Sequence, residues 1–125
     1  MSAPTEQTYR VATYSHACTA YIRTTLRRAL EFHGRDNVWH GTEYVNAALT
    51  MTTGPDILPD ESVWDLSKTQ LMTIHRALEY RQGKRKAGTA DIGVSHVVLA
   101  EWSFIEAEIT RVLRSIWHSE GRYWM

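Results

Sequence analysis

The stretch that decides the fold runs from Ser95 to His118 and reads SHVVLAEWSFIEAEITRVLRSIWH. Its apolar residues recur mostly at steps of three and four, which places them on one side of an α-helix with about 3.6 residues per turn. They are Val98, Trp102, Ile105, Ile109, Val112, Leu113 and Ile116. We therefore predict one long helix whose apolar stripe must be covered by other parts of the chain.

The N-terminal segment supplies the first covering helix. No Gly or Pro occurs from Thr5 to His33, so we predict one helix that ends at Gly34, a residue type favoured at helix C-termini. An alternative stays open for residues 7–14, where Thr, Tyr and Val favour a strand. These residues can instead form a short extended arm before a helix capped by Ser15.

A second covering helix is predicted after the tetrapeptide SKTQ at residues 67–70. This tetrapeptide has the form of a capping box, in which the Ser hydroxyl and the Gln amide oxygen each accept a hydrogen bond from the other residue's backbone N–H. The helix is predicted to run to about Gln82, because Gly83 follows. Residues 84–93 then form a basic, glycine-containing loop.

The middle of the chain predicts one shorter helix. Thr42 can cap a helix over Glu43 to about Met51. Residues 56–65 are predicted to form a loop with a helical turn after Pro59. The whole chain therefore predicts an all-α fold, an irregular bundle of three longer helices and one short helix, with the option of a short extended N-terminal arm.

Length and composition indicate one globular domain over residues 1–125. The chain has a mass of 14.4 kDa and is 43% hydrophobic and 22% charged, which is ordinary for a folded protein with a modest core. Fourteen basic residues balance fourteen acidic ones. No overall field therefore draws the protein to nucleic acid or to an anionic membrane, and any such binding has to be local.

The expected location is the cytoplasm, with no membrane partner. The first ten residues are polar and lack the apolar core of a signal peptide, and no run of about 18 apolar residues is present to span a membrane. The single cysteine, Cys18, cannot form an internal disulfide, which suits a reducing compartment.

An excess of large polar aromatics suggests an interaction protein. The chain has five Trp and six Tyr but two Phe, and Trp and Tyr are enriched where one edge of the ring stays in contact with water. Filling a small core is the alternative use of the same residues. The interaction candidates are Trp39, Phe104, Trp117, Tyr123 and Trp124, and the last two lie in a tail that either folds back onto the domain or inserts into a partner.

The first functional hypothesis is therefore a small soluble module that binds another protein, or itself as a homo-oligomer, through aromatic and charged surfaces. A compact chain of this kind can serve as an adaptor or as an inhibitor of a larger complex, including one encoded by a phage or mobile element. That last idea comes from the small size and general character of the chain and not from a motif.

A basic cluster offers candidate contacts to phosphate. It consists of Arg81, Lys84, Arg85 and Lys86, and nucleic acid or nucleotide binding through such a local patch stays open beside a solvated loop. Gly83 and Gly88 have the spacing of a phosphate-binding loop. Thr89 stands where that motif requires Lys, however, so the P-loop is rejected.

The six histidines are scattered and predict no metal site. His75 and Glu79 are four residues apart on one predicted helix, so they can form an acid–base pair or share a ligand. A histidine without a catalytic role is the simpler interpretation. No His-Glu-x-x-His and no repeated Glu-x-x-His motif is present, and we expect no cofactor, no metal and no assigned catalytic residue.

One short pattern supports an alternative function. Arg28 and His33 form Arg-x-x-x-x-His, which resembles the signature of HEPN-type ribonucleases, helical proteins that cleave RNA without metal where two protomers meet. The resemblance implies that Arg28 stabilises phosphate charge and His33 acts as an acid or base. Ala29 departs from the polar residue usual after the Arg. On a regular helix the five-residue step turns by about 140°, so the two side chains diverge unless the helix ends before His33.

The assignment of Trp102 to the core and of Trp124 to the surface predicts opposite effects of truncation. Trp102→Ala should lower the free energy of unfolding by about 3–5 kcal/mol, the usual cost of removing a buried large aromatic side chain. Trp124→Ala should leave it nearly unchanged. Thermal or denaturant unfolding of both variants checks this, and the reverse order would overturn the assignment.

Overall fold

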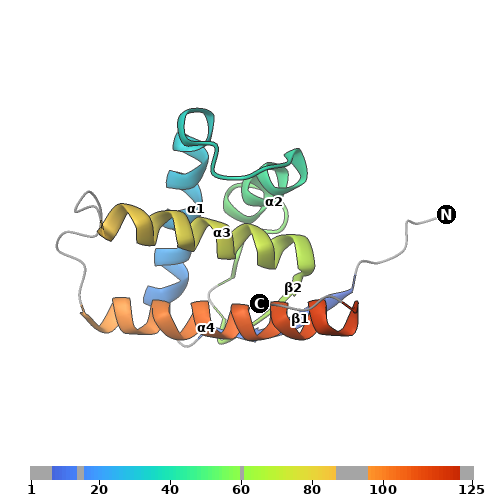
Figure 1. The fold of residues 1–125 in the computed structure, drawn as a ribbon. Coiled ribbons are helices and arrows are strands. Elements are labelled where there is room, and N and C mark those ends of the chain that lie inside the picture. The colour runs from blue at the N-terminus through green and yellow to red at the C-terminus, as the bar shows by residue number, and fades with distance from the viewer. Residues whose placement is uncertain (1–6, 14–15, 60, 87–95, 122–125) are drawn as a thin grey trace.

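The computed structural model describes residues 7–13, 16–59, 61–86 and 96–121. Within these ranges the chain forms two strands and four helices (Figure 1). In chain order they are β1 (Thr8–Ala12), α1 (His16–Asp36), α2 (Thr42–Thr52), β2 (Val63–Ser67), α3 (Lys68–Lys86) and α4 (His96–Ser119). The helices α3 and α4 lie side by side and antiparallel, α1 crosses both, and α2 packs on α1 and α3.

The fold is mostly helical but not strictly all-α, because β1 and β2 form a small antiparallel sheet. The extended-arm alternative for residues 7–14 is confirmed by β1, and the prediction of a helix beginning at Thr5 is wrong because α1 begins at His16. The predicted loop over residues 56–65 is also wrong at its end, where Val63 begins β2. The two strands form together, because each supplies hydrogen-bond partners for the backbone N–H and C=O groups of the other.

The register of the sheet separates an inner from an outer face. Val11 pairs with Trp64, and both side chains are buried. Arg10 pairs with Asp65 on the other face, where both side chains are exposed and Nε of Arg10 lies 3.5 Å from Oδ1 of Asp65. Because side chains alternate along a strand, this register sends Trp64 inward and leaves Asp65 in solvent.

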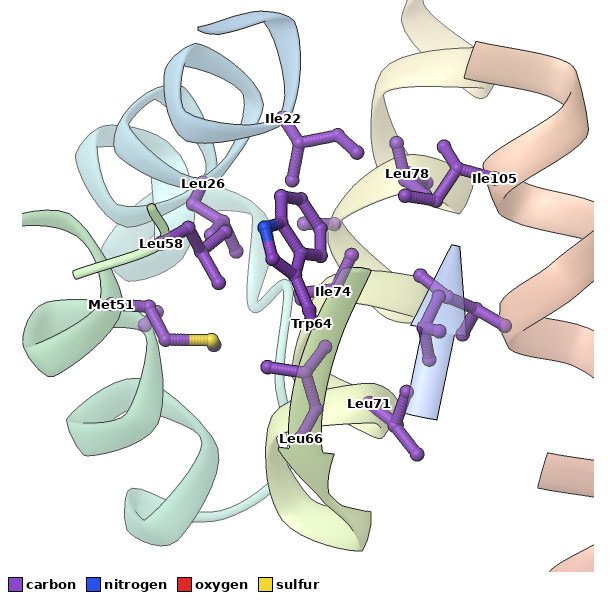
Figure 2. Packing of buried hydrophobic residues seen from close by; sticks show 14 of the residues in the cluster. Ile22, Leu26, Met51, Leu58, Trp64, Leu66, Leu71, Ile74, Leu78 and Ile105 are labelled. Atoms are coloured by element: carbon purple, nitrogen blue, oxygen red, sulfur yellow. The ribbon is translucent and has the colours of Figure 1, made fainter. Parts of the chain in front are cut away.

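Trp64 lies at the centre of the core. Its side chain is 2% exposed, and its indole N–H donates to a backbone carbonyl over 3.0 Å. Figure 2 shows the indole ring among apolar side chains from α1, α3 and the segment before β2: Ile22, Leu26, Leu58 and Ile74. The small sheet is therefore part of the packing of the helices and not a separate extension.

The capping box before α3 is confirmed by two reciprocal hydrogen bonds. The backbone N–H of Gln70 donates to Oγ of Ser67 over 3.1 Å, and the backbone N–H of Ser67 donates to Oε1 of Gln70 over 2.9 Å. The predicted end of this helix is wrong, because α3 continues through Gly83 to Lys86. Residues 84–86 therefore belong to a helix and not to the predicted basic loop, whose remaining residues lie outside the described ranges.

The ends of α1 and α2 differ from the prediction in small ways. Gly34 lies inside α1, and Asn37, just after the helix, takes the left-handed backbone conformation with φ 50°. Asn tolerates this conformation better than most residues, so it terminates the helix in the place expected of glycine. The predicted Thr42 cap is also wrong, since α2 begins at Thr42 and Gly41 stands before it with φ 151°.

The long C-terminal helix is confirmed. Six of the seven residues of the predicted stripe have described side chains, and all six are buried: Trp102, Ile105, Ile109, Val112, Leu113 and Ile116. α1, α3 and β1 contact this helix and cover its stripe. None of the helices in the described ranges combines the length and apolarity needed to cross a membrane.

Tyr80 joins α3 to the C-terminal end of α1. Its hydroxyl donates to Oδ2 of Asp36 over 2.5 Å. Oδ1 of the same carboxylate lies 3.1 Å from Nε of Arg35. Burial and the hydrogen bond to Asp36 together raise the pKa of Tyr80 above its ordinary value of 10.0. The folded state therefore holds the phenolic proton more tightly than the unfolded state does.

This pKa direction predicts a loss of stability in alkali that depends on Tyr80. Its contribution is complete below about pH 10, where the unfolded tyrosine is protonated, and falls as the pH rises through the higher folded pKa. The free energy of unfolding should therefore decline more steeply above about pH 10 in the wild type than in Tyr80→Phe. Denaturant unfolding at a series of pH values measures both slopes, and equal slopes would contradict the assignment.

The register of the sheet predicts unequal effects at two neighbouring residues. Trp64→Ala should lower the free energy of unfolding by about 3–5 kcal/mol, because the vacated volume lies at the centre of the core. Val63→Ala, on the outer face of the same strand, is the matched control and should change it by less than about 1 kcal/mol. Urea unfolding of both variants decides, and similar losses would mean that the register is wrong.

Candidate functional site

A pocket of about 400 Å³ lies where the α1–α2 connection, α2, α3 and α4 meet. We call it the Trp39–Trp117 pocket. Its lining comprises Val38, Trp39, His40, Tyr44, Met72, His75, Arg76, Glu79, Leu113 and Trp117. This volume suits one or two large side chains or a small ligand.

One face of α3 supplies the largest share of the lining. His75 and Arg76 lie three and four residues after Met72, and Glu79 lies three residues after Arg76, so the four residues share a face of the helix. Leu71, Ile74 and Leu78 lie on the other side of α3, buried in the core. The capping box thus starts a helix that serves the core with one face and the pocket with the other.

Trp39 forms a buried wall of the pocket. Its side chain is 2% exposed, its indole N–H donates to the backbone carbonyl of Thr73 over 3.1 Å, and its ring packs on His33 with centroids 5.6 Å apart. The sequence placed Trp39 in a connection and left open whether it packs on the domain or contacts a partner. Its burial depends on an acceptor 34 residues away, which no local pattern reveals.

Trp117 is half-buried on α4 and lines the same pocket, so the fold brings together two of the predicted interaction residues. Phe104 lies more than three turns earlier on α4, with 62% of its surface exposed, and does not line this pocket. Tyr123 and Trp124 lie outside the described residues. Of the five aromatic candidates, Trp39 and Trp117 therefore define a common site.

The polar groups of the pocket are held by specific contacts. Nδ1 of His75 lies 3.1 Å from Oε1 of Glu79, as their four-residue spacing suggested. Nε of Arg76 donates to the carbonyl of Val38 over 2.7 Å. Nδ1 of His40, at the rim, lies 3.2 Å from the side-chain nitrogen of Asn37. Sequence reasoning singled out His75 and Glu79 but missed Arg76, Met72 and Tyr44. The shared face of α3 was an available signal for Arg76 and Met72, whereas Tyr44 lies on α2.

The lining combines the His75–Glu79 pair and Arg76 with apolar walls. An imidazole held by a carboxylate can accept or donate a proton, but the described residues that line the pocket include no Ser, Thr or Cys that it could activate as a nucleophile. Within the described ranges, no three His, Cys, Asp or Glu side chains approach one another as a metal site requires. Apolar walls and a few fixed polar groups are the usual features of a binding pocket.

Arg28 and His33 lie on one continuous helix, α1, and do not converge within the chain. Arg28 is exposed. His33 is half-buried, and its Nδ1 accepts the backbone N–H of Trp39 over 3.3 Å. His33 therefore has a structural contact at the end of α1, and the ribonuclease hypothesis gains no paired site from the geometry of one chain.

One of the four basic candidates, Arg81, packs against α1, and the other three lie at the C-terminal end of α3. The guanidinium of Arg81 lies 3.9 Å from the ring centroid of Tyr21, and its Nη1 donates to the hydroxyl of Thr25 over 2.7 Å. Arg81 is thus committed to packing against α1. The side chains of Lys84, Arg85 and Lys86 lie outside the description, although their backbone belongs to α3.

No protein-family model, curated protein or solved structure matches this chain. Its function is therefore inferred from the side chains of the pocket and their geometry.

Proposed function

We propose that the protein is a small binding module that recognises another protein through the Trp39–Trp117 pocket. The observation that carries this proposal is the convergence of aromatic and apolar side chains from four separate segments around one opening. Trp, Tyr, Met and Arg, all present in the lining, are the residue types enriched at the centres of protein interfaces. An apolar side chain of the partner is the natural anchor for such a pocket.

Fixed walls favour binding at this site. The indole of Trp39 donates a hydrogen bond to Thr73 on α3. Arg76 on α3 donates a second hydrogen bond to Val38, in the α1–α2 connection that carries Trp39. A pocket that is already formed loses little conformational entropy when a ligand enters. An adaptor or an inhibitor of a larger complex both require recognition of this kind, and a second copy of this chain is one kind of partner that the pocket can serve.

Capture of a partner should depend on Trp117 and not on Phe104. Tagged wild-type protein, Trp117→Ala and Phe104→Ala would be used for affinity capture from the native host, followed by mass spectrometry. Phe104→Ala is the matched control, a more exposed aromatic on the same helix. We expect Trp117→Ala to weaken binding of the captured protein by about 10-fold or more, the effect of losing an interface anchor, and Phe104→Ala to leave it unchanged.

Four further tests accompany this experiment. Thermal melts establish that Trp117→Ala is folded, and Tyr44→Ala tests the same pocket from a different helix. Equal capture by all variants would refute the proposed site. Light scattering shows whether the partner is a second copy of the chain, and cleavage of mixed single-stranded RNA that His33→Ala abolishes would favour the ribonuclease alternative instead.

A further inference from the structure

We propose that Arg76 makes the Trp39–Trp117 pocket a carboxylate-recognition site, which takes an Asp or Glu side chain of a partner segment together with a neighbouring bulky apolar residue. This inference rests on the proposed function, because it names the chemistry of the segment that the same pocket would bind.

Arg76 is held in a fixed position at the pocket. Its side chain is half-buried, and Nε donates to the carbonyl of Val38 over 2.7 Å, so one edge of the guanidinium is anchored to the α1–α2 connection. The guanidinium group is planar, and anchoring Nε limits the directions in which the two amino groups can point. Arg76 is thereby preorganised to bind a ligand.

Among the described residues, the amino groups of Arg76 have no hydrogen-bond or ion-pair partner. Across the described part of the chain, the bond from Nε to Val38 is the only hydrogen bond of this residue, and no carboxylate lies within ion-pair distance of it. Arg81, also half-buried on α3, instead has both a hydroxyl and an aromatic ring as partners. A partly desolvated guanidinium with free N–H groups is the arrangement that accepts a carboxylate in a bidentate manner.

The charges around Arg76 favour a single negative charge over a polyanion. Glu79 carries the one carboxylate among the described lining residues, and its Oε1 is already paired with Nδ1 of His75. That carboxylate repels a second anion in proportion to its charge. One carboxylate can be balanced by Arg76, whereas the phosphates of a nucleotide or of RNA would meet greater repulsion from Glu79.

The apolar part of the lining determines the rest of the ligand. Tyr44, Met72 and Trp117 are half-buried hydrophobic residues packed on the core, and they leave apolar surface around the opening. A carboxylate alone would leave that surface in water. An acidic residue beside a Leu, Phe or Trp satisfies both the guanidinium and the apolar wall, as expected of an interface anchor and its flanking polar contact.

Peptide selection tests this inference without a known partner. A library of random linear peptides with blocked C-termini is displayed against the immobilised full-length protein, and peptides that also bind Trp117→Ala are removed. We expect the selected peptides to carry Asp or Glu within two positions of a bulky apolar residue. A synthetic capped peptide should lose about 10- to 100-fold in affinity when its acid is changed to the amide, as when a charge-assisted contact is removed.

The corresponding change in the protein should produce the same loss. Arg76→Gln should weaken the acidic peptide about 10- to 100-fold and leave the amide peptide unaffected, so that the two changes together add nothing further. Arg28→Gln, an exposed arginine on α1, is the matched control and should have no effect. Thermal melts verify that Arg76→Gln is folded, and if it is not, the comparison of acidic and amide peptides decides alone.

The outcomes separate this inference from the proposed function. Selected peptides that depend on Trp117 but lack an acidic residue, or bind Arg76→Gln as tightly as wild type, would overturn carboxylate recognition and leave the binding pocket intact. A failure to select any peptide that depends on Trp117 would overturn both. Tighter binding of adenosine monophosphate than of the acidic peptide would also overturn the inference, in favour of a phosphate ligand.

Discussion

The pairing of β1 with β2 is the interaction on which the rest of the structure depends. The two five-residue strands are joined in a register that directs Trp64 into the centre of the core. The backbone N–H of Thr13 extends the pairing to Ser62 over 2.8 Å. An isolated pair of strands is only marginally stable in water, so the helices that pack around Trp64 stabilise the sheet as much as the sheet positions them.

The same pairing positions α3 and hence the pocket. Ser67 is the last residue of β2 and also the cap of α3, so the helix starts at a point that the sheet has already placed. One face of α3 then packs in the core, and the other carries Arg76 and Met72 toward the α1–α2 connection. Two hydrogen bonds link that connection to α3: Trp39 donates to Thr73, and Arg76 on α3 donates to Val38.

Several features were predictable because their causes are local. The stripe of α4 follows from residue spacing within one helix, and the capping box follows from two residues three positions apart. The strand-favouring composition of residues 7–14 indicated an extended arm as an alternative. The candidate site was only partly predictable: Trp117 and the His75–Glu79 pair were identified, but the sequence left open whether Trp39 is buried, and Arg76 was not considered.

By itself, the sequence determined that the protein is mostly helical, where the C-terminal helix lies and which of its faces is buried, because these depend on spacings of three and four residues. Tertiary structure alone decided that residues 63–67 form a strand, that Trp39 is buried and that Arg76 faces a pocket. Each of these outcomes requires a partner distant in sequence: Thr8 for Ser67, Thr73 for Trp39 and Val38 for Arg76. Such partners leave no periodic signal, since the contact exists only after the chain has folded.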